Sequence, residues 1–213
     1  MKYAMSVHPK VLEKDFETTV DLNNLKDIYN ILKGKELEDI PDETLTEIAE
    51  YLRKAWFLIN KREGINLRDR EKLAPVFSEL NRIVKGSDQV NKAYRGVRLS
   101  SFDPNALSRT YPNSINDPEV LEHLESLAYG LRSWGDSKNM GLEWAMGKDT
   151  TKDKVLFEID YPEIVLESYN LFKYLGNRYF MDYGELVLNI KNPKILNIEF
   201  NVSYFTVKIK DMG

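Results

Sequence analysis

The sequence predicts an α+β protein in which a helical segment precedes a strand-rich one. Up to residue 88, apolar residues recur at the three- and four-residue spacing of amphipathic helices. Beyond that point, short apolar runs of alternating polarity follow one another, several of them bounded by glycine, asparagine or proline. We therefore expect a helical subdomain over residues 1–88 and a second domain over residues 89–213.

Composition excludes several functional classes. The 213 residues are enough for a real core, and 42% hydrophobic with 30% charged residues is ordinary for a soluble globular protein. The net charge of −4 is spread evenly, so bulk charge does not indicate nucleic-acid binding, although a local basic groove stays open. Without cysteine, and with only His8 and His123, no metal site is expected.

The start of the chain does not resemble a secretory signal, because its first ten residues lack an apolar run. No apolar stretch of 18 residues occurs anywhere in the sequence. Together with the absence of cysteine, this predicts a cytoplasmic protein that does not bind membranes.

Three amphipathic helices are expected in the N-terminal part. The first covers 22–33, between Asp21 as a helix cap and a glycine at its end. The second begins at the Pro-Asp pair 41–42, and its apolar stripe continues to Ile59. The third covers 66–84, where an internal proline should kink or split it. Such stripes are typical of a core rather than of a functional site.

The C-terminal part is expected to consist of short elements. A polar segment rich in Ser, Asn, Pro and Asp separates the first strand from the elements that follow. The predicted strands and helices are a strand at 93–99, a helix at 118–128, a short element at 131–134, a helix at 137–146, a strand at 154–160, a short helix at 167–175, and strands at 184–190, 195–200 and 204–209.

The strand at 93–99 carries the first candidate site residue. Side chains alternate along a strand, which places Arg95 on the apolar side between Ala93 and Val97. A guanidinium keeps its charge, so on a buried face it needs an anion. Gly96 removes a side chain where a ligand could approach the backbone. The alternative is that Arg95 forms a buried ion pair with a carboxylate of the chain itself.

Two further residues are candidates for a functional site because of their positions in the predicted elements. Ser133 precedes a turn into a helix, where its hydroxyl can bind a ligand, and the alternative is a simple turn residue. Glu185 enters a strand whose next three residues are apolar, so its carboxylate should lie at the mouth of a core. It can stabilise a cation or bind a hydroxyl group, with Tyr183 on the same face two residues earlier. The alternative is a solvated glutamate on an edge strand.

In this order, the arginine, the serine and the glutamate resemble the R-S-E class of mono-ADP-ribosyltransferases. The resemblance is to the small enzymes of tailed bacteriophages in particular, which place helices ahead of the catalytic fold. It covers the chain from residue 93 onward. The segments that carry it are Tyr94–Gly96, Arg132–Trp134, Leu142–Ala145, Val155–Ile159 and Gly184–Leu188.

The resemblance implies transfer of ADP-ribose from NAD to a macromolecule, with release of nicotinamide and without a metal. It implies two small β-sheets packed against each other, with NAD in the cleft of an NAD-binding catalytic core over 89–213. Arg95 and Gly96 would bind NAD through its phosphates and its nicotinamide amide, and Trp144 would pack near nicotinamide. Ser133 would brace the strands and the ribose, and Glu185 would be the catalytic glutamate.

The acceptor stays open, because family members that modify arginine usually carry an acid two residues before the catalytic glutamate. Here that residue is Tyr183, which the resemblance places on the acceptor side of the reaction. The acceptor would be a host protein, through arginine or another side chain, or a nucleic acid that stacks on aromatic residues. An NAD glycohydrolase and a non-catalytic binding protein are the alternatives. A phage-encoded enzyme would act in the host cytoplasm.

Overall fold

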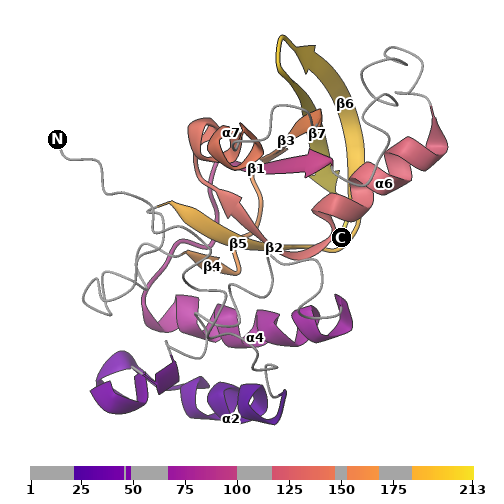
Figure 1. Cartoon of the computed structure of the whole chain (residues 1–213). Coiled ribbons are helices and arrows are strands. Elements are labelled where there is room, and N and C mark those ends of the chain that lie inside the picture. Colours follow the sequence, from indigo (N-terminus) through magenta and orange to yellow (C-terminus); the bar gives the residue numbers. More distant parts are fainter. Residues whose placement is uncertain (1–21, 46, 49–66, 100–116, 147–152, 168–183) are drawn as a thin grey trace, which may run out of the picture.

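Helices α2 (Leu22–Leu32) and α4 (Leu67–Ile83) pack against each other at one end of the molecule, as the computed structural model in Figure 1 shows. The structure describes residues 22–45, 47–48, 67–99, 117–146, 153–167 and 184–213. A short 3-10 helix, η2 (Leu37–Asp39), follows α2. None of the helices in these ranges is long and apolar enough to cross a membrane.

Helix α4 is a single helix although Pro75 lies inside it. Proline removes one backbone hydrogen bond of a helix, which was the reason to expect a kink or a split. Pro75 is exposed, so water can solvate the carbonyl group that loses its donor. The opposite side of the helix carries the buried Leu73, Val76 and Phe77, and their packing holds the two halves of α4 together.

Two more helices belong to the C-terminal part. Helix α6 (Pro118–Ala128) begins as the sequence predicts, because the Asp117 carboxylate accepts a hydrogen bond from the backbone N–H of Glu119 at 2.9 Å. Helix α7 (Lys138–Met146) follows the second strand directly, and the Ser137 hydroxyl accepts from the N–H of Met140 at 3.4 Å at its start.

The strands form one seven-stranded mixed sheet in the order β4-β5-β2-β1-β3-β7-β6. Within the described residues, β3 and β7 are parallel and all other neighbouring strands are antiparallel. The strands are β1 (Lys92–Leu99), β2 (Gly130–Gly135), β3 (Asp153–Asp160), β4 (Leu166–Glu167), β5 (Glu185–Ile190), β6 (Pro193–Asn201) and β7 (Tyr204–Asp211).

The sheet differs from the two packed sheets that the family resemblance implies. Hydrogen bonds join all described strands, because β1 pairs with β3 along its whole length and also with β2. Only one residue pair, Tyr94 with Gly135, is in register between β1 and β2. Glu167, expected to begin a helix, belongs to β4 instead, and residues 168–175 lie outside the described ranges.

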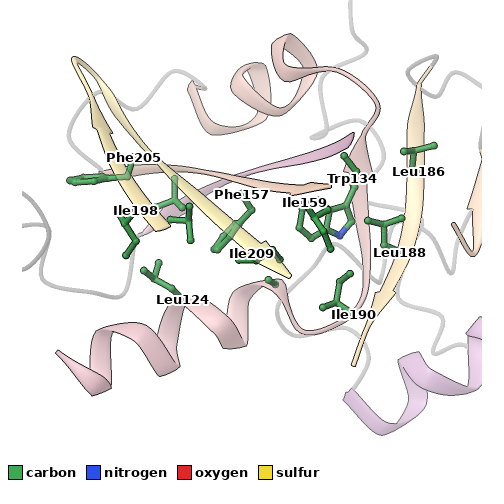
Figure 2. Close-up of a cluster of buried hydrophobic side chains, with 14 of the residues drawn as sticks. Leu124, Trp134, Phe157, Ile159, Leu186, Leu188, Ile190, Ile198, Phe205 and Ile209 are labelled. Carbon is green, nitrogen blue, oxygen red and sulfur yellow. The ribbon is translucent and has the colours of Figure 1, made fainter. Parts of the chain in front are cut away.

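Two apolar cores lie on the sheet. One core unites α2 and α4 with Leu131 of β2, Leu166 of β4 and Val187 of β5. The other joins α6 to β1, β3, β6 and β7 and to the opposite face of β2 and β5, with Trp134 and Phe157 at its centre (Figure 2). The N-terminal helices therefore share a core with the strands that carry Ser133 and Glu185.

A polar clamp adds to this contact between α4 and β4. The buried amide of Asn81 donates to the Ser87 carbonyl at 3.0 Å and accepts from the N–H of Glu167 at 3.0 Å. The Glu167 carboxylate in turn accepts from the N–H of Ser87 at 2.9 Å. These three hydrogen bonds fix the end of α4 relative to the strand beside β5.

Candidate active site

The structure brings Arg95, Ser133 and Glu185 together from β1, β2 and β5. One guanidinium nitrogen of Arg95 (Nη1) donates to the backbone carbonyl of Ser133 at 2.6 Å. The Ser133 hydroxyl donates to the Glu185 carboxylate oxygen Oε1. The three residues predicted from the sequence therefore form one hydrogen-bonded chain across neighbouring strands.

The register of β2 and β5 explains the contact between Ser133 and Glu185. Gly135 pairs with Glu185, and Ser133 pairs with Val187, so Ser133 is the diagonal neighbour of Glu185 on one face of the sheet. Both side chains are buried, Ser133 being 2% and Glu185 8% exposed. A buried carboxylate is stable only with hydrogen-bond donors around it, and the serine hydroxyl is one of them. Glu185 is thus not a solvated edge residue.

Other elements cover the sheet on both sides of Ser133 and Glu185, on the face to which these two side chains point. Leu131 and Val187, each two residues from a site residue, belong to the core with α2 and α4. Met140 of α7 lies against Gly135, where an added Cβ would come within 3.0 Å of its side chain. Ser133 and Glu185 therefore lie between the N-terminal helices and α7.

Packing against a helix requires a glycine at position 96, which the sequence alone does not reveal. Its Cα faces α7, and an added Cβ would lie 1.9 Å from the Gly141 carbonyl oxygen and 2.5 Å from the Ala145 nitrogen. The space that we attributed to an approaching ligand is therefore filled by a helix. A contact of the Gly96 backbone with nicotinamide stays a prediction.

The structure does not test the roles predicted for the other two site residues. Trp144 is half-buried on α7, one residue before the buried Ala145, and its packing against nicotinamide stays a prediction. Tyr183 lies outside the described residues, so its role toward the acceptor is likewise still a prediction. Within the described ranges, no group of three or more His, Asp or Glu side chains could hold a metal ion.

Asp136 is a further residue near the site, and it is not among the site residues predicted from the sequence. Its N–H donates to the Gly184 carbonyl at 2.8 Å, and its carboxylate lies over Gly184, where an added Cβ would be 2.5 Å from Oδ1. Partial burial of the carboxyl and the negative charge of Glu167 raise the pKa of Asp136 above its usual value. The signal in the sequence is the glycine before Glu185, which adopts a φ of +102°.

We expect Asp136→Asn to stabilise the fold at pH 7 and to have no such effect at pH 3. A raised pKa means that the folded chain keeps a proton that the unfolded chain loses as the pH rises past 3.8. Stability is therefore lost as pH rises through this window, and asparagine avoids the loss. Because the residue is largely exposed, the gain should stay below about 1 kcal/mol. Thermal melting at both pH values measures it, with Asp27→Asn on α2 as control. An equal gain at pH 3 would contradict this explanation.

Comparisons with known proteins give a likeness of structure only. The sequence matches no family model and no curated protein. Among solved structures it is similar to the ADP-ribosyltransferase Vis in complex with agmatine, with 11% identity, a TM-score of 0.43, and coverage of 90% of this chain and 84% of that chain. Plx2a, an ADP-ribosyltransferase toxin from Paenibacillus larvae, is 16% identical, with a TM-score of 0.40 and coverage of 92% and 98%. C3larvin toxin from the same organism is 17% identical, with a TM-score of 0.31 and coverage of 81% and 95%. Values this low carry no argument about activity.

Proposed function

We propose that the protein is a mono-ADP-ribosyltransferase of the R-S-E class, which moves ADP-ribose from NAD to a macromolecular acceptor and releases nicotinamide. The observation that carries the proposal is the hydrogen-bonded chain Arg95–Ser133–Glu185. The order of these residues supports the class, and their contact across three strands supports a shared site. NAD is a substrate here, and no metal takes part.

The reaction breaks the bond between C1′ of the nicotinamide ribose and the nicotinamide ring nitrogen. Nicotinamide leaves with the bonding electron pair, and positive charge develops on the ribose. The Glu185 carboxylate, hydrogen-bonded to the ribose 2′-hydroxyl, stabilises that charge in the transition state. Ser133 holds the carboxylate in position, and a nucleophilic atom of the acceptor then bonds to C1′ and releases its proton to water.

The proposed acceptor is a side chain of a host protein, with Tyr183 on the acceptor side. The test is incubation of the protein with NAD labelled in the adenylate part and a bacterial lysate, followed by treatment with protease or nuclease. Label that disappears with protease supports a protein acceptor, and label that disappears with nuclease indicates a nucleic acid. Nicotinamide release without any labelled macromolecule would instead indicate an NAD glycohydrolase. Absence of NAD binding at millimolar concentration would reject both enzymatic functions.

Arg95→Lys should weaken NAD binding by about 10-fold or more and leave the melting temperature nearly unchanged. Lysine keeps the charge but loses the planar fork that binds a phosphate through two hydrogen bonds, each of which contributes about 1.5 kcal/mol or more. Titration calorimetry with NAD measures the effect. Arg82→Lys is a matched control, because Arg82 on α4 also donates to a backbone carbonyl, that of Lys35, at 2.8 Å. Equal NAD affinity in the two variants would remove Arg95 from the binding site.

A further inference from the structure

Two cations face each other across strands β1 and β3. Arg98 pairs directly with Lys154 in the antiparallel ladder, and both side chains are half-buried. Side chains opposed in this way have Cβ atoms about 5 Å apart, and like charges at this position destabilise a sheet. Among the described residues, neither cation has an ion pair or a hydrogen bond to a carboxylate.

Two acids of β3, at the other end of the strand, are paired with another residue. Glu158 and Asp160 both pair with Lys92, the first through a hydrogen bond and the second at 3.1 Å. These contacts raise the pKa of Lys92, mainly through its hydrogen bond to Glu158, because both carboxylates favour its charged form. Neither of these two acids is paired with Arg98 or Lys154, which lie at the other end of the strands.

A third cation and an aromatic ring lie at the same corner of the sheet. Val155 pairs with Phe205 of the parallel strand β7, which places Tyr204 beside Lys154. The ammonium group of Lys138, at the start of α7, lies 5.9 Å from the centroid of the Tyr204 ring. Figure 1 shows β1, β3, β7 and α7 grouped in this way. Positive charge therefore gathers here, although the whole chain carries −4.

This corner lies on the same face of the sheet as Ser133 and Glu185 but apart from them, whereas Arg95 belongs to the other face of β1. Arg98 shares its face of β1 with Tyr94 and Gly96, and Tyr94 is joined through Gly135 to Glu185. Helix α7 packs against Gly96 and Gly135 and so covers the sheet between the two positions. Arg98 is three residues, or about 10 Å, further along β1 than Arg95.

We propose that Arg98 and Lys154, together with Lys138, form a second site that binds the phosphate or diphosphate group of a small nucleotide ligand. A bound phosphate would convert the repulsion between the two cations into charge-assisted hydrogen bonds. Two neighbouring cations match one compact anion, whereas a nucleic-acid backbone requires a track of basic residues. The proposal goes beyond the transferase function and does not depend on it.

Inorganic pyrophosphate is the probe for this site, and its binding is measured by titration calorimetry and thermal melting. We expect it to bind and stabilise the wild-type protein, and its affinity to fall about 10-fold or more in Arg98→Gln and in Lys154→Gln. Without ligand, both variants should melt at or above the wild-type temperature, because the repulsion is gone. Lys26→Gln, at an exposed lysine of α2, is the control for the loss of one charge.

Two results would overturn the proposal. One is pyrophosphate binding that is absent from the wild type or equally strong in both variants. The other is a lower melting temperature of both variants without ligand, because the pair would then stabilise the fold by itself. Competition identifies the ligand class: adenosine diphosphate should displace pyrophosphate, and adenosine should not. A single-stranded oligonucleotide that displaces it more effectively than adenosine diphosphate would reject a small ligand.

Discussion

Glu185→Gln is expected to lower the rate of ADP-ribose transfer by ~10²–10³-fold. Glutamine has the size of glutamate and can still accept the hydrogen bond from the Ser133 hydroxyl, so the fold around this buried position should persist. What disappears is the negative charge beside the developing oxocarbenium ion. Because that interaction strengthens mainly in the transition state, the affinity for NAD should hardly change.

The measurement compares nicotinamide release and transfer of label with NAD binding by calorimetry. Glu199→Gln, at an exposed glutamate of β6, is the matched control and should keep the wild-type rate. A Glu185→Gln protein that retains most of its transferase rate would falsify the proposed function. Equal losses of rate and of NAD affinity would instead show that Glu185 serves binding of the ground state.

The second large effect is expected from Gly96→Ala, which should destabilise the fold by about 3 kcal/mol or more. The added methyl group would lie 1.9 Å from the Gly141 carbonyl oxygen and 2.5 Å from the Ala145 nitrogen. Both are backbone atoms of α7, so the helix has to move away from β1 to make room. For a chain of this size, such a loss lowers the melting temperature by roughly 6–12 °C.

Gly135→Ala provides the contrast for this prediction. Its methyl group would also face α7, but the nearest atoms belong to the flexible side chain of Met140, at 3.0 Å. This side chain can adopt another rotamer, so the melting temperature should fall by a few degrees at most. Similar losses in both variants would show that α7 is not fixed by the contact at Gly96. Thermal melting followed by circular dichroism measures both.

Local patterns predict the elements that have clear boundaries or clear periodicity. Helix α6 has the predicted bounds, because Asp117 and Pro118 mark its start in any context. The alternating apolar residues of strand β3 predict it to within one residue, because it begins one residue earlier than expected and ends at the expected position. Strand β4 has only two residues and therefore no periodicity that a sequence could show. The continuity of α4 through Pro75 depends on which side of the helix is packed, which is a tertiary property.

The site was predictable as a set of residues but not as an arrangement. The types and order of Arg95, Ser133 and Glu185 are visible in the sequence, whereas their contacts depend on the pairing of β2 with β5 and of β1 with β2. No local pattern specifies that register. The joining of all strands in one sheet likewise rests on a single pair, Tyr94 with Gly135. Gly96 illustrates the same limit, because a glycine required by a helix and one required by a ligand look identical in a sequence.

The central place of β1 in the sheet has a consequence for how the protein would acquire the proposed activity. Strand β1 pairs with β2 and β3, and β2 pairs with β5, so the chain from Arg95 to Glu185 closes contacts between residues 38 and 52 positions apart. Such non-local pairing is slow compared with helix formation, because long loops must close before any contact rewards them. During refolding, the helical signal of α2 and α4 should therefore return before nicotinamide release does. A ribosome-bound chain would stay inactive until β5 has emerged and paired with β2.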